Sequence, residues 1–64
     1  MSWHFVAMKD EEDDYHVHEL YEGYSWTGPI KPYGESVEEL IKELEMMLSD
    51  VRKHGEYIDE SNRQ

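Results

Sequence analysis

The sequence predicts a small α+β domain, with elements in the order ββ(β)α, in which a short antiparallel sheet packs one amphipathic helix on one face. Residues 37–54 place apolar side chains at helical spacing. Two earlier stretches, 3–9 and 15–22, are rich in aromatic and β-branched residues and alternate in polarity, as strands do. A chain of 64 residues has room for one domain, which we expect over residues 1–60, followed by a frayed tail over 61–64.

The first two expected strands form a hairpin. Between them lie five consecutive acidic residues, 10–14, which repel one another and cannot pack in a core. These residues are therefore expected at the turn of the hairpin. A shorter third strand is predicted over 24–27, and the Gly-Pro pair at 28–29 ends it.

The helix carries its own start and stop signals. Ser36 and Glu39 fit a capping box, in which each side chain accepts a backbone N–H at the start of a helix. Gly55 suits the position just after the helix, and beyond it Tyr57 and Ile58 are expected to pack back on the domain. Seven apolar residues share an arc of about 120° on the helical wheel, wide enough to face a core. They are Val37, Leu40, Ile41, Leu44, Met47, Leu48 and Val51.

One helix can cover only one face of the sheet. Strand alternation separates Trp3 and Phe5 from the residues between them, and register alone leaves open which face the helix covers. The larger apolar set with Trp3 and Phe5 is the expected core. The second face is then a dimer interface, a partner site or a solvated surface. The candidates on this second face are Met8, His16, His18 and Leu20.

Acidic residues dominate the charge of the chain. Sixteen Asp and Glu residues face six Lys and Arg residues, for a formal net charge of -10. Such a surface repels the phosphates of nucleic acids and of anionic membranes, so we expect neither as a direct partner. It attracts a basic protein surface and accelerates the encounter with it. The alternative is that the acidity serves solubility alone.

Two groups of residues are candidates for binding such a partner. The first is the acidic turn, formed by Asp10, Glu11, Glu12, Asp13 and Asp14. The second follows one stripe of the helix at positions i, i+4, i+7 and i+11, where negative charge surrounds a soft apolar anchor. Its residues are Glu39, Glu43, Met46 and Asp50. The alternative for this stripe is a solvated helix face.

No motif in the sequence indicates catalysis. The chain has no cysteine, no glycine-rich phosphate loop and no GxSxG sequence. His16 and His18 point the same way from a strand, but a zinc site needs three or four ligands. We therefore expect a protein that is not an enzyme and that binds no metal or cofactor. The start of the chain lacks a basic region and a long apolar run, so we expect no signal peptide and a cytoplasmic location.

Several motifs carry a resemblance to a known family. The chain opens with Trp3, continues with Tyr-His-Val-His-Glu-Leu-Tyr at 15–21 and with Trp26, and enters the helix through Pro-Tyr-Gly-Glu-Ser-Val-Glu-Glu-Leu at 32–40. In these motifs it resembles a family of short, uncharacterised bacterial and phage proteins, which implies the fold and no activity. The strand order and the helix start at 34–40 also resemble, more weakly, the N-terminal domain of HicB-type antitoxins. That second resemblance implies a toxin as partner.

The charge and the motifs together favour a non-enzymatic interaction protein that docks on a basic protein surface. A nucleic-acid-binding partner is expected, because small acidic phage inhibitors and DNA mimics, anti-CRISPR proteins among them, are similar in size and charge. One alternative is a HicB-like antitoxin or regulatory partner that uses the open sheet face. The other is a small structural homodimer with no charged target.

Overall fold

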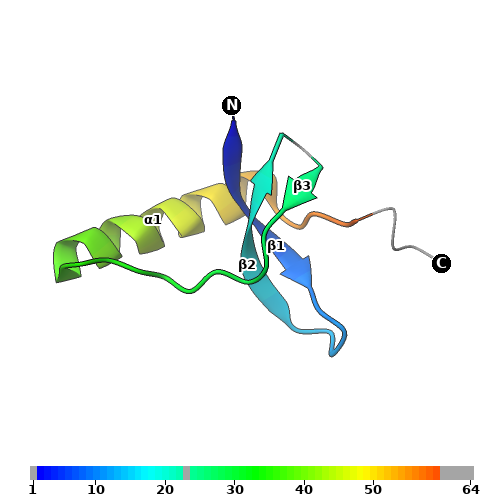
Figure 1. Ribbon diagram of the computed structural model, residues 1–64, viewed down its shortest axis with the longest axis horizontal. Helices are drawn as coiled ribbons and strands as arrows, with labels where there is room; N and C mark the ends of the chain where they lie inside the picture. The colour runs from blue at the N-terminus through cyan, green and yellow to red at the C-terminus, as the bar shows by residue number, and fades with distance from the viewer. Residues whose placement is uncertain (1, 23, 60–64) are drawn as a thin grey trace.

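A computed structural model describes residues 2–22 and 24–59. Its elements are β1 (Trp3–Lys9), β2 (Tyr15–Tyr21), β3 (Ser25–Trp26) and α1 (Val37–His54). The strands form one antiparallel sheet in the order β1-β2-β3, and α1 lies against β1 (Figure 1). The α+β class and the expected order of elements are thus confirmed. The tail expected over 61–64 lies outside the described residues.

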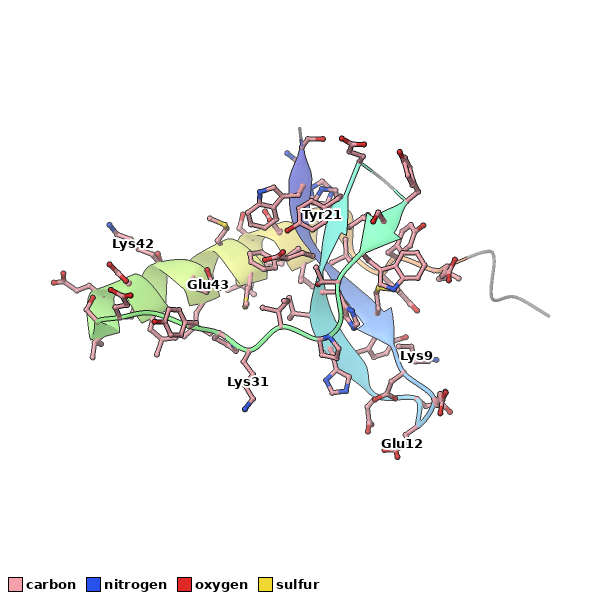
Figure 2. The ribbon with its side chains drawn as sticks, viewed as in Figure 1. Lys9, Glu12, Tyr21, Lys31, Lys42 and Glu43 are labelled. Atoms are coloured by element: carbon pink, nitrogen blue, oxygen red, sulfur yellow. The ribbon has the colours of Figure 1, made fainter. Side chains whose placement is uncertain are left out.

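The acidic run forms the turn of the hairpin, as expected. β1 pairs with β2 so that Met8 lies opposite His16, and the chain reverses between them. The carboxylate of Asp10 holds the turn, because its Oδ1 atom accepts the backbone N–H groups of Glu12 at 2.8 Å and of Asp14 at 2.9 Å. Side-chain acceptors of this kind replace backbone partners in a tight turn. Figure 2 shows Glu12 at the tip, at the opposite end of the sheet from Tyr21.

Irregular backbone pairs with both outer edges of the hairpin, in addition to β3 on the β2 side. On the β1 edge, Ala7 donates to the carbonyl of Gly55 at 3.1 Å and accepts from the N–H of Tyr57 at 2.9 Å. On the β2 edge, the carbonyl of Val17 accepts from the N–H of Ile30 at 2.8 Å. These bonds satisfy backbone groups that would otherwise invite another strand to pair.

A buried cluster lies on the sheet face that the sequence left open. Val6, Met8 and Leu20 form it, and the half-buried rings of Trp26 and Tyr57 pack against it. The expectation that Met8 and Leu20 lie on an open second face is therefore wrong, since they are only 8% and 5% exposed. The reason is long-range: β3 pairs Trp26 with Leu20, and the chain after α1 returns along β1 and brings Tyr57 over the same face. The expected return of Tyr57 is confirmed.

The caps of α1 form as expected. The hydroxyl of Ser36 accepts the N–H of Glu39 at 3.1 Å, while the carboxylate of Glu39 accepts the N–H of Glu35 at 3.0 Å. At the other end Gly55 has a φ of 70° and donates its N–H to Val51 at 2.8 Å. Such groups satisfy backbone atoms that have no partner within the helix.

The C-terminal half of α1 makes the contact with β1. The N–H of Phe5, on the outer edge of β1, donates to Oδ2 of Asp50 at 3.1 Å. The ring of His4 stacks on the ring of His54, with centroids 3.6 Å apart. Burial at this contact lowers the pKa of His4, the positive charges of His54 and Lys53 lower it further, and Asp50 opposes them. The N-terminal half of α1 projects beyond the sheet (Figure 1).

The orientation of α1 differs from the expected one. Met47 is buried and Leu40 and Val51 are half-buried, whereas the other four apolar residues of the expected core stripe are exposed. These four are Val37, Ile41, Leu44 and Leu48. The helix is therefore rotated so that one side of its apolar arc, rather than its centre, faces β1. The contact of Asp50 with Phe5 accompanies this rotation, because Asp50 lies one turn from Met47 on the same side of the helix.

Candidate functional site

A groove of about 520 Å³ opens beside the buried cluster, near the hairpin end of the sheet. The ends of β1 and β2 form one wall, and the segment after α1 forms the other. Figure 2 shows Lys9 at this end of β1. The residues that line the groove are Met8, Lys9, Asp10, His16, His18, Trp26, Pro29, Glu56, Tyr57, Ile58 and Asp59.

Aromatic and sulfur-containing side chains form the apolar part of the groove. Met8 is part of the buried cluster, and the half-buried rings of Trp26 and Tyr57 pack against that cluster. The two ring centroids lie 5.8 Å apart with an angle of 50° between the ring planes. Aromatic faces attract cations and the alkyl stems of long basic side chains, and methionine adapts its shape to a guest. This surface can therefore accept a lysine or arginine side chain.

Carboxylates dominate the charged part of the groove. Asp10, Glu56 and Asp59 contribute three of them, against the single ammonium group of Lys9. The side chain of Lys9 lies beside the hairpin turn. Its Nζ atom is 3.9 Å from Oδ1 of Asp13 and 5.4 Å from the ring centroid of Tyr15. The potential at the groove is consequently negative.

Hydrogen bonds fix several of the polar groups around the groove. Nε2 of His16 lies 2.9 Å from Oδ2 of Asp10, and Nδ1 of His18 donates to the carbonyl of Thr27 at 2.7 Å. The pKa of Asp10 is lowered, first by the backbone N–H of Asp14 and further by the N–H of Glu12 and by His16. Asp10 therefore keeps its negative charge at neutral pH.

The groove unites candidates that the sequence had placed in separate groups. Met8, His16 and His18 come from the expected second face, and Asp10 comes from the acidic turn. Leu20 is buried beneath them in the cluster and is inaccessible to a partner. The rest of the acidic turn stays exposed at the tip; these residues are Glu11, Glu12, Asp13 and Asp14.

The expected helix stripe of Glu39, Glu43, Met46 and Asp50 is not a solvated row. Asp50 is half-buried and accepts the N–H of Phe5, and Glu39 accepts the N–H of Glu35 at the helix start. Glu43 is half-buried as well, so only Met46 retains an exposed side chain without such a role. The stripe is therefore divided between two environments, because the rotation of α1 turns Glu43 and Asp50 toward the sheet side and leaves Glu39 and Met46 exposed.

Apart from Lys9 at the end of β1, the groove residues that sequence reasoning missed lie outside the two strands of the hairpin. Trp26, Glu56 and Asp59 were assigned no role, although Trp26 is one of only two tryptophans in the chain. The one available signal was the aromatic and aliphatic pair at 57–58, which indicated a return of the chain to the domain. Glu56 and Asp59 flank that pair in the sequence, so they also lie at the groove.

Within residues 2–22 and 24–59, no three potential ligand side chains converge where a metal ion could be held. The helix of the described chain is too polar to cross a membrane. Comparison with family models, curated proteins and solved structures found no match. The two resemblances noted in the sequence therefore stay predictions.

Proposed function

We propose that this protein is a non-enzymatic interaction protein that docks on a basic protein surface, with a lysine or arginine side chain of the partner held in the groove. The observation that carries the proposal is the combination of aromatic rings and carboxylates in one concave site. Trp26 and Tyr57 offer ring surfaces, while Glu56 and Asp59 offer negative charge beside them. A basic side chain is attracted by the rings and by the negative charge at once, whereas a neutral apolar side chain is attracted by the rings alone.

The energetics favour a cation over other guests. A cation held against an aromatic face gains more as water is removed from the contact, and a nearby carboxylate adds a charge-assisted hydrogen bond. The formal charge of -10 raises the rate at which a basic partner arrives. The same charge opposes the phosphates of nucleic acids. Within this class, an inhibitor that imitates the charge of DNA is our finer proposal, and it requires a nucleic-acid-binding partner.

The test titrates an isotope-labelled protein with the peptide acetyl-Gly-Lys-Gly-Lys-Gly-amide and follows its amide and indole signals by NMR. We expect the largest shifts at Trp26 and Tyr57, and weaker binding as salt is added. Replacing both Glu56 and Asp59 with their amides should weaken binding at least about fivefold, if each charge contributes on the order of 0.5–1 kcal/mol. A peptide with norleucine in place of lysine serves as the uncharged reference.

The matched control removes the same charge elsewhere. Glu22→Gln with Glu35→Gln also lowers the net negative charge by two, but neither residue lines the groove. If both double variants weaken peptide binding equally, net charge alone attracts the peptide and the groove is not the site.

A further inference from the structure

An apolar stripe runs along the side of α1 that the sheet does not cover. Val37, Ile41, Leu44 and Leu48 are 73%, 47%, 44% and 53% exposed. They follow one another at i, i+4, i+7 and i+11, which places them side by side over about 16 Å of helix. On the helical wheel they span about 60°. Contiguous exposed apolar side chains of this kind mark an interaction surface.

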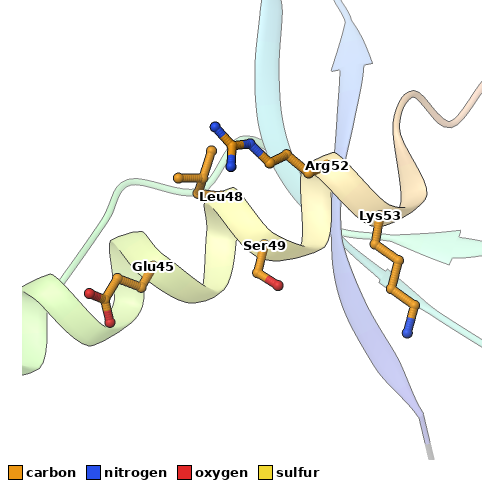
Figure 3. Close-up of a pocket in the computed structure, with 5 residues that line it drawn as sticks. All are labelled: Glu45, Leu48, Ser49, Arg52 and Lys53. Carbon is orange, nitrogen blue, oxygen red and sulfur yellow. The ribbon is translucent and has the colours of Figure 1, made fainter.

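A shallow hollow continues this stripe toward the C-terminal end of α1. It has a volume of about 420 Å³ and is lined by Glu45, Leu48, Ser49, Arg52 and Lys53 (Figure 3). Leu48 belongs to both the stripe and the hollow. An apolar side chain that lies against the stripe from outside can therefore extend into the hollow.

Charged residues along one border of the stripe indicate how a partner helix is oriented. Glu38, Glu45 and Arg52 follow one another at intervals of seven residues, so they lie on the same side of the helix next to the stripe. Within residues 2–22 and 24–59 none of the three forms an ion pair. When a second helix with the same sequence runs antiparallel, Glu38 of each copy comes close to Arg52 of the other, and Glu45 comes close to its own copy at the centre of the contact. The two attractive pairs outnumber the one repulsive pair. In a parallel pair this border of one helix lies on the opposite side of the contact from the same border of the other helix, so Glu38 meets neither Arg52 nor its own copy.

We infer that a second copy of this chain docks on the stripe, with the two α1 helices antiparallel about a twofold axis. Residues of the stripe in one copy then face those of the other, and Val37 of one copy lies near the hollow beside Leu48 of the other. The arrangement is isologous, as in most homodimers. It also lets opposite helix dipoles lie side by side.

The size of the chain gives this contact a physical reason. A chain of 64 residues buries a small core, here five buried apolar residues among those described. Small domains without disulfides or metals commonly gain stability by association. A contact based on one helix stripe is at the small end of specific interfaces, so we expect a dimer that dissociates in the roughly micromolar range.

The dimer contact goes beyond the proposed docking on a basic surface and does not depend on it. The stripe and the groove share no residue. A dimer therefore leaves two grooves open, and two linked grooves bind a partner with repeated basic sites more tightly than one.

The test is sedimentation velocity of the full chain at about 1–500 µM, a range that brackets the expected dissociation constant. We expect a monomer–dimer equilibrium. Ile41→Glu should abolish the dimer, because it places two charges in an apolar contact. Met46→Glu is the matched control, since Met46 is as exposed as Ile41, at 47%, but lies on another side of α1. Circular dichroism of both variants verifies that the helix still forms.

A charge exchange tests the antiparallel orientation. Glu38→Arg should weaken the dimer, and adding Arg52→Glu should restore it, because the ion pairs re-form with their signs reversed. In a parallel dimer Glu38 and Arg52 do not meet, so Glu38→Arg should leave the dimer unchanged and adding Arg52→Glu should restore nothing. The inference is overturned if the chain is monomeric up to about 500 µM, or if Met46→Glu dissociates the dimer as fully as Ile41→Glu. The variant with Glu56→Gln and Asp59→Asn should dimerise normally, so failure of the groove proposal would leave this result unaffected.

Discussion

Replacing Asp50 with alanine should destabilise the fold, although the sequence suggested Asp50 for partner binding. The carboxylate accepts the backbone N–H of Phe5 at 3.1 Å, and Phe5 itself is only 1% exposed. The N–H lies on the outer edge of β1, where no strand supplies a partner at this position. Without the carboxylate, this partly buried donor loses its protein acceptor.

The size of the destabilisation in Asp50→Ala follows from the type of hydrogen bond that is lost. Hydrogen bonds to charged groups contribute about 1.5–3 kcal/mol to stability. A domain of this length has a free energy of unfolding of about 3–10 kcal/mol, so the loss is a large fraction of the total. A loss of about 2 kcal/mol lowers the Tm of so small a domain by about 8–16 °C. Asp50→Asn keeps an oxygen acceptor without the charge, and about half of that shift is expected.

Thermal and urea unfolding, followed by circular dichroism, measure the effect. Glu45→Ala is the control, because Glu45 lies on the same helix and its removal changes the net charge equally, but it is exposed and forms no bond to β1. We expect this control to stay within about 0.5 kcal/mol of the parent chain. Amide exchange should accelerate at Phe5 in Asp50→Ala. Equal Tm values for the two variants, with Phe5 still protected, would refute a structural role for Asp50.

Two further predictions concern His4 and Gly34. The fold holds the pKa of His4 below its usual value of about 6.5 through burial and the nearby His54, so the unfolded chain takes up the proton first as pH falls. The free energy of unfolding should therefore decrease as pH falls below about 6.5 and level off below the pKa of folded His4. In His4→Phe the urea midpoint should depend less on pH between pH 5 and 7. An equally steep pH dependence in His4→Phe and in the parent chain would contradict this reasoning. Gly34→Ala should cost about 1–3 kcal/mol, because the added Cβ would lie 2.3 Å from the backbone nitrogen of Leu40. Gly28→Ala is the neutral control, because no atom lies within 4 Å of its added Cβ. Equal Tm values for the two variants would contradict the prediction, because the helix start would then shift to admit the Cβ at no cost in stability.

Local signals explain why the elements could be predicted. The helix at 37–54 was expected with both of its caps, because the residues that form the caps lie within four positions of the atoms they satisfy. The acidic turn was expected because charge repulsion alone excludes it from a core. Strand ends were less certain: the second strand ends at Tyr21 rather than at 22, and the third covers only Ser25–Trp26.

Long-range contacts explain what could not be predicted. Periodicity defines an apolar arc on a helix, but the part of that arc that faces the sheet depends on where β1 crosses it. The bond between Phe5 and Asp50, which are 45 residues apart, is one such contact. The groove depends on another, the return of the chain after Gly55 to pair with Ala7. Neither pairing leaves a pattern in a neighbouring stretch of sequence.

The width of the apolar arc on α1 connects the fold with the proposed dimer. Seven apolar residues cover about 120° of the helix, yet only Met47 among them is buried. The side of the arc that carries Met47 contacts the sheet, and Asp50 and His54 contribute to the same contact. The remaining apolar residues lie farther around the helix, and nothing in the described part of the chain buries them. A solvated face there would need no apolar residues, so a contact outside the single chain explains them better than the monomer does.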